Sequence, residues 1–177
     1  MRLGFLRRAQ TSSTTRCSTT GRASVEGCPP VVEHQKPCRE TWPDSLDVMG
    51  WEVTDNGSSA IFSRDIPQLV TTQLREVASD FLARHQLALG DIDRFVCHPG
   101  GAKVVEALER AFDLGQGALV DAWGVLRDYG NMSATTVMFV LERMLAEARA
   151  TGERWERALM SALGPGFTAG FLVLDNR

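Results

Sequence analysis

The 177-residue sequence lacks a long hydrophobic run, and it lacks a strong excess of charge of either sign. A membrane-spanning helix needs about 20 consecutive apolar residues, and no segment approaches that length. The formal net charge of −3 and the pI near 5.6 give no electrostatic reason to expect nucleic acid or an anionic membrane as a partner. With 44% hydrophobic and 23% charged residues, the composition indicates a soluble globular chain with one sizeable core.

The sequence also lacks a metal-binding arrangement. No CxxC pair occurs among Cys17, Cys28, Cys38 and Cys97, and no histidine pair lies at helical spacing near a cysteine. A disulfide framework is not expected in a chain of this length with its own core. We therefore expect no metal site and free thiols in a reducing compartment, the cytoplasm.

The first 27 residues contain no acidic side chain before Glu26 and are rich in Arg, Ser and Thr. Such a segment cannot bury enough apolar surface to become ordered. Its composition is also typical of an organelle transit peptide, but the runs at residues 11–15 and 18–22 are poor helix formers. We interpret residues 1–27 as a disordered leader or as sequence foreign to the fold, such as a misplaced start or a frame change. Residues 28–177 are then one domain.

Regular patterning begins near Trp51, after a proline-interrupted stretch at residues 28–50 that is predicted to be irregular. The predicted elements are strands at 51–55 and 60–64, a helix from Asp65 past Phe81, a strand at 93–97, helices over 104–112, 119–126 and 137–148, and strands at 158–163 and 169–175. This order favours a layered α/β unit with a buried mixed sheet.

Three turns carry residues suited to chemistry. His98 follows a predicted strand and precedes Gly100 and Gly101, whose backbone can approach a ligand closely. Asn131 precedes a helix, where it can act as an N-cap or donate its amide to an oxygen that gains negative charge. Residues 164–167 fit a tight turn. Taken singly, each of these turns fits a structural role.

Taken in order, the turns resemble a known family. His98-Pro99-Gly100-Gly101, then Tyr129-Gly130-Asn131-Met132-Ser133, then Gly164-Pro165-Gly166-Phe167 are similar to the signature series of type III polyketide synthases, the chalcone and stilbene synthase family. Trp42-Pro43-Asp44, Met49-Gly50-Trp51 and Phe62-Ser63-Arg64-Asp65-Ile66-Pro67 resemble the bacterial branch. Related ketoacyl-carrier-protein synthases usually follow the His with Gln-Ala-Asn. The resemblance is clear from about residue 41 onward and covers the C-terminal half of a family member.

The resemblance implies a fold and a reaction. The fold is the C-terminal half of a thiolase-like αβαβα arrangement, a mixed sheet packed between helices, in a family of homodimers. The reaction is acyl transfer: a Cys takes an acyl starter from coenzyme A, and decarboxylative Claisen condensation of malonyl-CoA extends it. Coenzyme A thioesters are substrates, and no cofactor is implied.

The resemblance also implies roles for residues. His98 and Asn131 match the two catalytic donors to the malonyl thioester oxygen. Ser133 and the turn Gly164, Pro165, Gly166 and Phe167 match the substrate pocket, and Gly100 and Gly101 lie near coenzyme A. Ala60 stands where many relatives carry a larger side chain, which leaves the size of the pocket open. Starter unit, number of extensions and cyclisation mode depend on both halves.

The family's nucleophilic Cys belongs to the N-terminal half, which this sequence does not match. Cys97 adjoins His98, but successive strand residues point to opposite faces, so we expect a core residue. Three hypotheses remain: an enzyme half completed by a separately encoded N-terminal half, a gene fragment without activity of its own, or a non-catalytic subunit that dimerises with a complete relative. The isolated chain should expose apolar surface meant for the missing half, and should aggregate.

Overall fold

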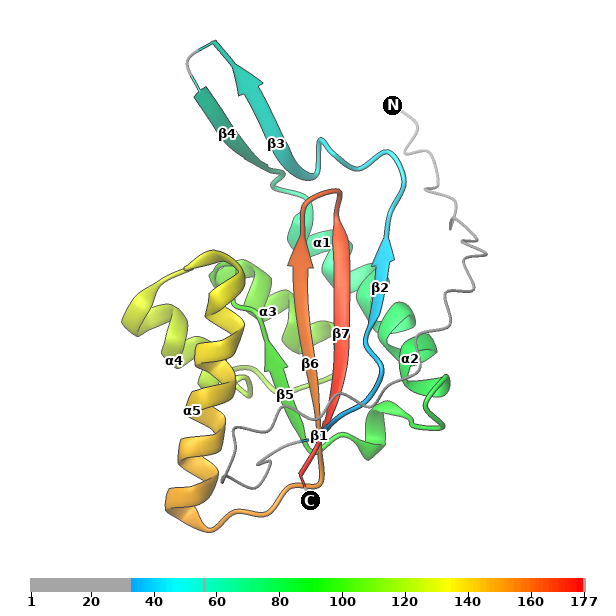
Figure 1. Cartoon of the computed structure of the whole chain (residues 1–177), viewed down its shortest axis with the longest axis vertical. Coiled ribbons are helices and arrows are strands. Elements are labelled where there is room, and N and C mark those ends of the chain that lie inside the picture. Colours follow the sequence, from blue (N-terminus) through cyan, green and yellow to red (C-terminus); the bar gives the residue numbers. More distant parts are fainter. Residues whose placement is uncertain (1–32, 56, 177) are drawn as a thin grey trace, which may run out of the picture.

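A computed structural model describes residues 33–55 and 57–176 (Figure 1). The predicted leader at residues 1–27, which contains Cys17, lies outside the described residues, and so does Cys28. The elements are β1 (Glu33–His34), β2 (Cys38–Thr41), β3 (Met49–Thr54), β4 (Gly57–Phe62), α1 (Ile66–Leu69), the π-helix η1 (Val70–Leu74), α2 (Arg75–Ala83), the short 3-10 helix η2 (Leu89–Asp91), β5 (Arg94–Cys97), α3 (Ala102–Ala111), α4 (Val120–Tyr129), the short 3-10 helix η3 (Ser133–Thr135), α5 (Thr136–Thr151), β6 (Arg157–Gly164) and β7 (Thr168–Asp175). From Met49 onward the order of strands and main helices is as predicted.

The prediction that residues 28–50 are irregular is wrong for two short segments. β1 and β2, on either side of Pro37, both pair antiparallel with β7 near the end of the chain. Cys38 lies opposite Phe171 in this pairing. Their strand conformation comes from partners more than a hundred residues away in sequence, as the residue numbers of the register show.

The five-stranded sheet is mixed, as predicted. β1 and β2 lie along one side of β7, β6 lies on its other side, and β5 follows β6. β5 runs parallel to β6, whereas β6 and β7 are antiparallel and are joined by residues 165–167. Gly166 has a φ of 70° in this turn, a conformation that glycine adopts without steric cost.

Helices cover both faces of the sheet. Phe95 of β5 stacks on Phe112 at the end of α3, and Phe171 of β7 stacks on Phe81 of α2. The strand register places Phe95 and Phe171 on the same face, so α2 and α3 share that face. The side chain of Arg94, which precedes Phe95 in β5, points to the opposite face of the sheet and pairs with Glu153 just after α5. Helix α5 packs against β5 and β6 there.

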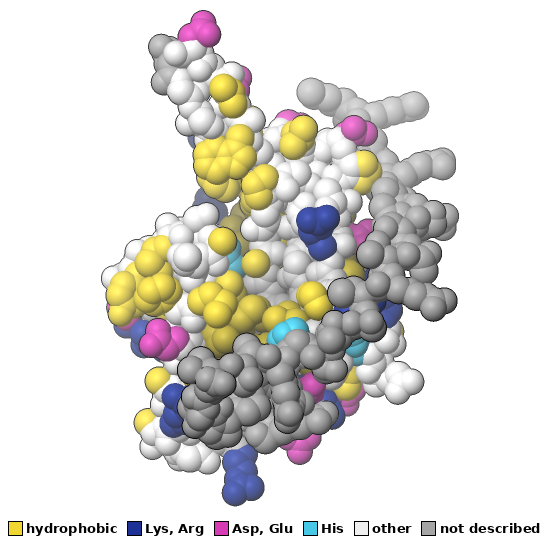
Figure 2. Space-filling view, viewed as in Figure 1, with side chains coloured by type: hydrophobic (Ala, Val, Ile, Leu, Met, Phe, Trp, Pro, Cys, Tyr) yellow, Lys and Arg dark blue, Asp and Glu magenta, His cyan; other side chains and the backbone are white. Residues whose placement is uncertain are grey.

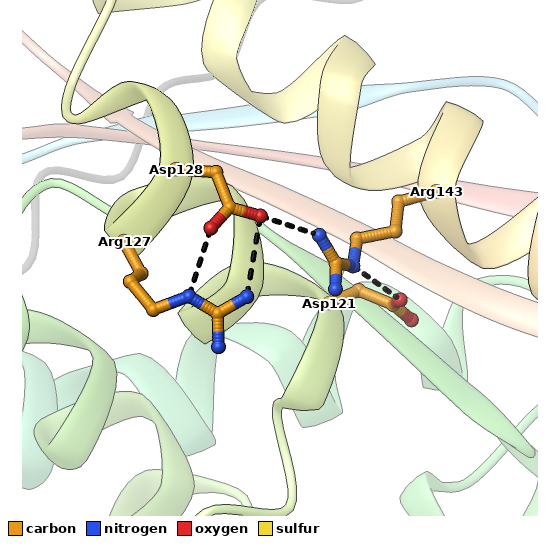
Figure 3. A network of polar contacts seen from close by, with 4 residues as sticks. All are labelled: Asp121, Arg127, Asp128 and Arg143. Carbon is orange, nitrogen blue, oxygen red and sulfur yellow. Dashed lines mark hydrogen bonds and ion pairs between the residues drawn. The ribbon is translucent and has the colours of Figure 1, made fainter.

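An ionic network holds α4 beside α5 (Figure 3). Asp128 accepts hydrogen bonds from Arg127 and from Arg143 of α5, the latter at 3.0 Å. Arg143 also lies 3.8 Å from Asp121. Burial, followed by the nearby Glu147 carboxylate, nevertheless raises the pKa of Asp121. Half-exposed pairs of this kind contribute little stability each, about 0–1 kcal/mol, and their main effect is to orient the two helices.

The β3–β4 hairpin projects away from the sheet (Figure 1). The side chains of Trp51, Val53 and Phe62 are 63%, 82% and 64% exposed. A two-stranded hairpin is marginally stable without further packing, so this one depends on contacts at its base. None of the helices in residues 33–55 and 57–176 combines the length and hydropathy of a membrane-spanning segment.

Candidate functional site

A cavity of about 980 Å³ lies at the base of the hairpin. Four segments line it: the hairpin and the turn after it (within 49–67), the loop after β5 with the first turn of α3 (within 98–104), the loop before α5 (within 131–134), and the end of β6 with the turn that follows (162–165). Figure 2 shows hydrophobic side chains gathered on the hairpin and at its base. The cavity therefore brings together segments that are far apart in the sequence.

His98 lies where β5 ends, and it lines the cavity. Its backbone N–H donates to the carbonyl oxygen of Ser161 at 2.9 Å, which extends the β5–β6 pairing by one residue. The Nδ1 atom is buried and has no hydrogen-bond partner among the described residues. Burial lowers the pKa of His98 from its ordinary value, so the imidazole is neutral near pH 7.

Asn131 lies in the loop between α4 and α5 and lines the same cavity. Its Nδ2 donates to the carbonyl oxygen of Gly100 at 3.0 Å, and its Oδ1 accepts from the backbone N–H of Ser133 at 2.9 Å. Asn131 is not an N-cap here, because Met132 and Thr135 occupy the cap positions of η3 and α5. The bond to Gly100 joins the Asn131 loop directly to the loop that carries His98.

The remaining predicted residues divide into two groups. Gly100, Ser133, Gly164 and Pro165 line the cavity. Gly101, Gly166 and Phe167 are not among the residues that line it.

Those three residues have structural positions instead. The Phe167 side chain is 1% exposed, and its ring packs 4.9 Å from the ring of Trp42. The backbone N–H of Gly166 donates to the carbonyl oxygen of Met49 at 2.7 Å. Gly101 is the residue just before α3. The turn after β6 thus anchors the hairpin through its second half and meets the cavity through its first.

The hairpin supplies an apolar wall, of which only Ala60 was linked to the pocket by the sequence. In the β3–β4 register Met49 lies opposite Phe62, and Trp51 lies opposite Ala60. These side chains share one face because strand residues alternate, and all four line the cavity. The signal was present, since residues 49–51 and 62–67 carry the family resemblance and Ala60 stands where many relatives carry a larger side chain.

Arg64 and Lys103 are the charged residues among those that line the cavity, and no carboxylate lines it within the described part of the chain. Both side chains are exposed, and neither pairs with a carboxylate of a described residue. In a chain with a formal net charge of −3, this concentrates positive charge at the cavity. The arrangement suits an anionic ligand.

Neither described cysteine lines the cavity. Cys97 is fully buried, as strand alternation predicted, and its sulfur accepts a hydrogen bond from the Ser161 hydroxyl at 3.3 Å. Burial raises the pKa of the Cys97 thiol to about 12. In residues 33–55 and 57–176 there is no group of three or more His, Cys, Asp or Glu side chains placed to hold a metal ion.

The sequence is similar to one family model, described as chalcone and stilbene synthases, C-terminal domain, over residues 34–176. It is 42% identical over 131 residues to a chalcone synthase-like protein of Bacillus subtilis, covering 74% of this chain and 35% of that protein. It is 37% identical over 133 residues to the 1,3,6,8-tetrahydroxynaphthalene synthase of Streptomyces peucetius, with 75% and 35% covered. The matched region thus spans about a third of the length of these relatives.

Solved structures show the same fold. The crystal structure of PKS-I from the brown alga Ectocarpus siliculosus matches with a TM-score of 0.77 and 25% identity, over 86% of this chain and 41% of that one. CsyB, solved in complex with CoA-SH, matches with a TM-score of 0.77 and 23% identity, over 84% and 42%. The fold is therefore the C-terminal part of the thiolase-like arrangement.

Proposed function

Because this chain belongs to the chalcone and stilbene synthase family, as its C-terminal domain, we propose that it provides half of the active site of a type III polyketide synthase. The assembled enzyme is an acyltransferase, whose active site condenses malonyl-CoA onto an acyl starter with loss of carbon dioxide. This half provides the groups that stabilise the enolate, and it needs an N-terminal half for the nucleophile.

The observation that carries this proposal is that His98 and Asn131 line one cavity and are joined through Gly100. Each has a hydrogen-bond donor to spare. The Asn131 amide has two N–H groups, and one of them is used on Gly100. The His98 Nδ1 is enclosed without a partner, which leaves Nε2 as the ring nitrogen able to donate to a ligand.

These donors suit decarboxylation. The bond between the malonyl carboxylate and the α-carbon breaks, carbon dioxide leaves, and the electron pair delocalises onto the thioester oxygen as an enolate. Donors fixed at that oxygen are worth most when the charge has developed, so they lower the barrier rather than only bind the ground state. The enolate carbon then attacks the starter's thioester carbonyl, forming the new carbon–carbon bond and releasing the cysteine thiolate.

The rest of the cavity supports coenzyme A thioesters as substrates. Arg64 and Lys103 offer positive charge for phosphate or carboxylate groups, and no other charged residue lines the cavity within the described part of the chain. Once the N-terminal half covers their exposed surface, the apolar side chains of Met49, Trp51 and Phe62 keep water from the enolate, which would otherwise take a proton before it could condense. No further cofactor is required, and the reaction suits the cytoplasm, where these thioesters are made.

Within the described part of the chain, neither cysteine is placed to act as the nucleophile. Cys97 is enclosed and un-ionised at neutral pH, and Cys38 lies outside the cavity. We propose that the N-terminal half of the family fold supplies a Cys beside His98. The assembled protein is a dimer, as the family resemblance implies. Exposed side chains around the site, Trp51, Phe62, Tyr129 and Met138 among them, are surface for that half to cover.

The test is to combine this chain with the N-terminal region of the Bacillus subtilis relative, which its matched segment does not cover. Release of carbon dioxide from malonyl-CoA is measured in the purified complex. We expect turnover in the complex and none with either part alone. Asn131→Ala should abolish most of the carbon dioxide release by the complex, whereas Asn176→Ala should not. Asn176 is a matched control because its Nδ2 also donates to a backbone carbonyl, that of Trp155, away from the cavity.

A folded complex that binds malonyl-CoA but does not decarboxylate it would reject the proposal. Co-purification only with a full-length relative, without turnover at this chain's site, would instead indicate a non-catalytic subunit. Failure to bind either partner would indicate a gene fragment without activity of its own.

A further inference from the structure

Helix α5 begins at Thr136, whose hydroxyl is fully buried in the loop that carries Asn131. We propose that Thr136 is a positioning residue that fixes the direction of the Asn131 carboxamide. The inference rests on the function proposed above, in which that carboxamide meets the thioester oxygen.

The Thr136 hydroxyl bridges the backbone on both sides of one peptide unit. Its Oγ1 accepts from the N–H of Met132 at 2.8 Å and donates to the carbonyl oxygen of Ser133 at 2.8 Å. A hydroxyl has one hydrogen to donate, and Thr136 uses it here while also accepting. Because no water reaches a fully buried side chain, losing the hydroxyl would leave the Met132 N–H without its partner.

Ser133 is the residue that this bridge holds in an unusual conformation. Its φ is 63°, in the left-handed region that non-glycine residues rarely adopt. Such a conformation persists only where surrounding contacts impose it. The N–H of Ser133 in turn donates to Oδ1 of Asn131 at 2.9 Å. The hydroxyl of Thr136 thus reaches Asn131 through the backbone of Ser133.

The consequence for Asn131 is a carboxamide that cannot flip. Its oxygen is committed to Ser133 and one N–H to Gly100, so the remaining N–H has a single direction. Donors that are fixed before the reaction stabilise a developing charge without reorganising. A helix-start threonine with only a structural role would stabilise α5 but would not set this direction.

The experiment compares three substitutions in the complex with the N-terminal region of the Bacillus subtilis relative. Thr136→Val keeps the shape and removes the hydroxyl, and Thr136→Ser keeps the hydroxyl. Thr135→Val is the matched control, because Thr135 lies in the same turn and its hydroxyl bonds only the carbonyl oxygen of Met132. Backbone amide exchange at Met132 and Ser133 is measured by NMR, and kcat and KM are measured for malonyl-CoA decarboxylation.

We expect Thr136→Val to accelerate exchange at Ser133 about tenfold and to lower kcat about tenfold with KM unchanged, as the loss of two hydrogen bonds to one hydroxyl would give. In Thr136→Ser and in Thr135→Val, both the exchange rate at Ser133 and kcat should stay within about twofold of the parent values. Unchanged Ser133 exchange and kcat in Thr136→Val would overturn the inference, as would an equal loss in Thr135→Val. If Thr136→Val does not assemble, Thr136→Ala replaces it as the variant without a hydroxyl.

Failure of the proposed function gives a different result. If Asn131→Ala decarboxylates as fast as the parent, the enolate role is rejected, while faster exchange at Ser133 in Thr136→Val still shows that Thr136 positions Asn131.

Discussion

Replacing Asn131 separates its two roles, because the structural role and the chemical role differ in size. The carboxamide makes two neutral hydrogen bonds, to Gly100 at 3.0 Å and from Ser133 at 2.9 Å. Asn131 is exposed, so each bond contributes near the lower end of the usual range, about 0.5 kcal/mol, and Asn131→Ala should cost about 1 kcal/mol of the free energy of unfolding. Losing a donor to an enolate oxygen costs about 3–4 kcal/mol of barrier, on the order of 10²–10³ in rate. The predicted kinetic loss therefore exceeds the stability loss severalfold.

Asn131→Asp sharpens the comparison. An aspartate keeps the oxygen that accepts from Ser133, but it turns a second oxygen toward the Gly100 carbonyl and places negative charge beside the forming enolate. We expect it to decarboxylate malonyl-CoA more slowly than Asn131→Ala, although Asp keeps nearly the side-chain volume of Asn and Ala does not. The assay is carbon dioxide release from the assembled complex at saturating malonyl-CoA, with thermal unfolding measured in parallel. A rate within tenfold of the parent in a folded Asn131→Ala complex would refute the reasoning.

Three further predictions follow from the titrating groups. Burial lowers the pKa of His98, so the stability that the neutral imidazole contributes is present above the ordinary histidine pKa of about 6.5 and is lost as pH falls through the lowered value. NMR titration of a complex whose nucleophilic Cys is replaced by Ala should place the His98 midpoint below 6.5. A midpoint at or above 6.5 would contradict this. Burial raises the pKa of Cys97 to about 12, so at pH 8 on the order of one thiol in ten thousand is ionised, and mass spectrometry after iodoacetamide treatment should find Cys97 modified only once the protein is unfolded. The backbone N–H groups of Arg157 and Glu156 lower the pKa of Asp93, so Asp93→Asn should reduce the free energy of unfolding at pH 7. Urea titrations should show that this difference shrinks as pH falls below the ordinary Asp pKa of 3.8 and through the lowered value. A difference that stays constant as pH falls below 3.8 would show that the carboxylate charge is not what those N–H groups stabilise.

The order of elements after Met49 could be predicted because each has a local signal. Apolar residues at helical spacing mark the helix through Val70, Leu74 and Phe81, all of which are buried. Asn56-Gly57 marks the hairpin turn. β1 and β2 carry no such signal, since their strand conformation depends on pairing with β7. The π-helical turn at Val70–Leu74 was also not predicted, because apolar spacing does not distinguish it from an α-helix.

The candidate site was predicted unevenly for similar reasons. The turns with His98 and Asn131 stand out as short polar motifs beside glycine, and the structure places both on one cavity. Phe167 belongs to such a motif but is drawn into the core by Trp42, a contact between distant segments. Thr136 has no motif signal at all. Its buried hydroxyl becomes visible only when the backbone of the preceding loop is known.

The central claim is that His98 and Asn131 act together as donors to one thioester oxygen. The most direct measurement is isotope-edited infrared spectroscopy of acetyl-CoA, labelled with ¹³C at the thioester carbonyl, bound to the assembled complex. Two hydrogen bonds to the oxygen should lower the carbonyl stretching frequency, each of Asn131→Ala and His98→Ala should reverse part of that shift, and the double variant should reverse all of it. A carbonyl frequency in the parent complex equal to that of acetyl-CoA in the double variant would contradict the account.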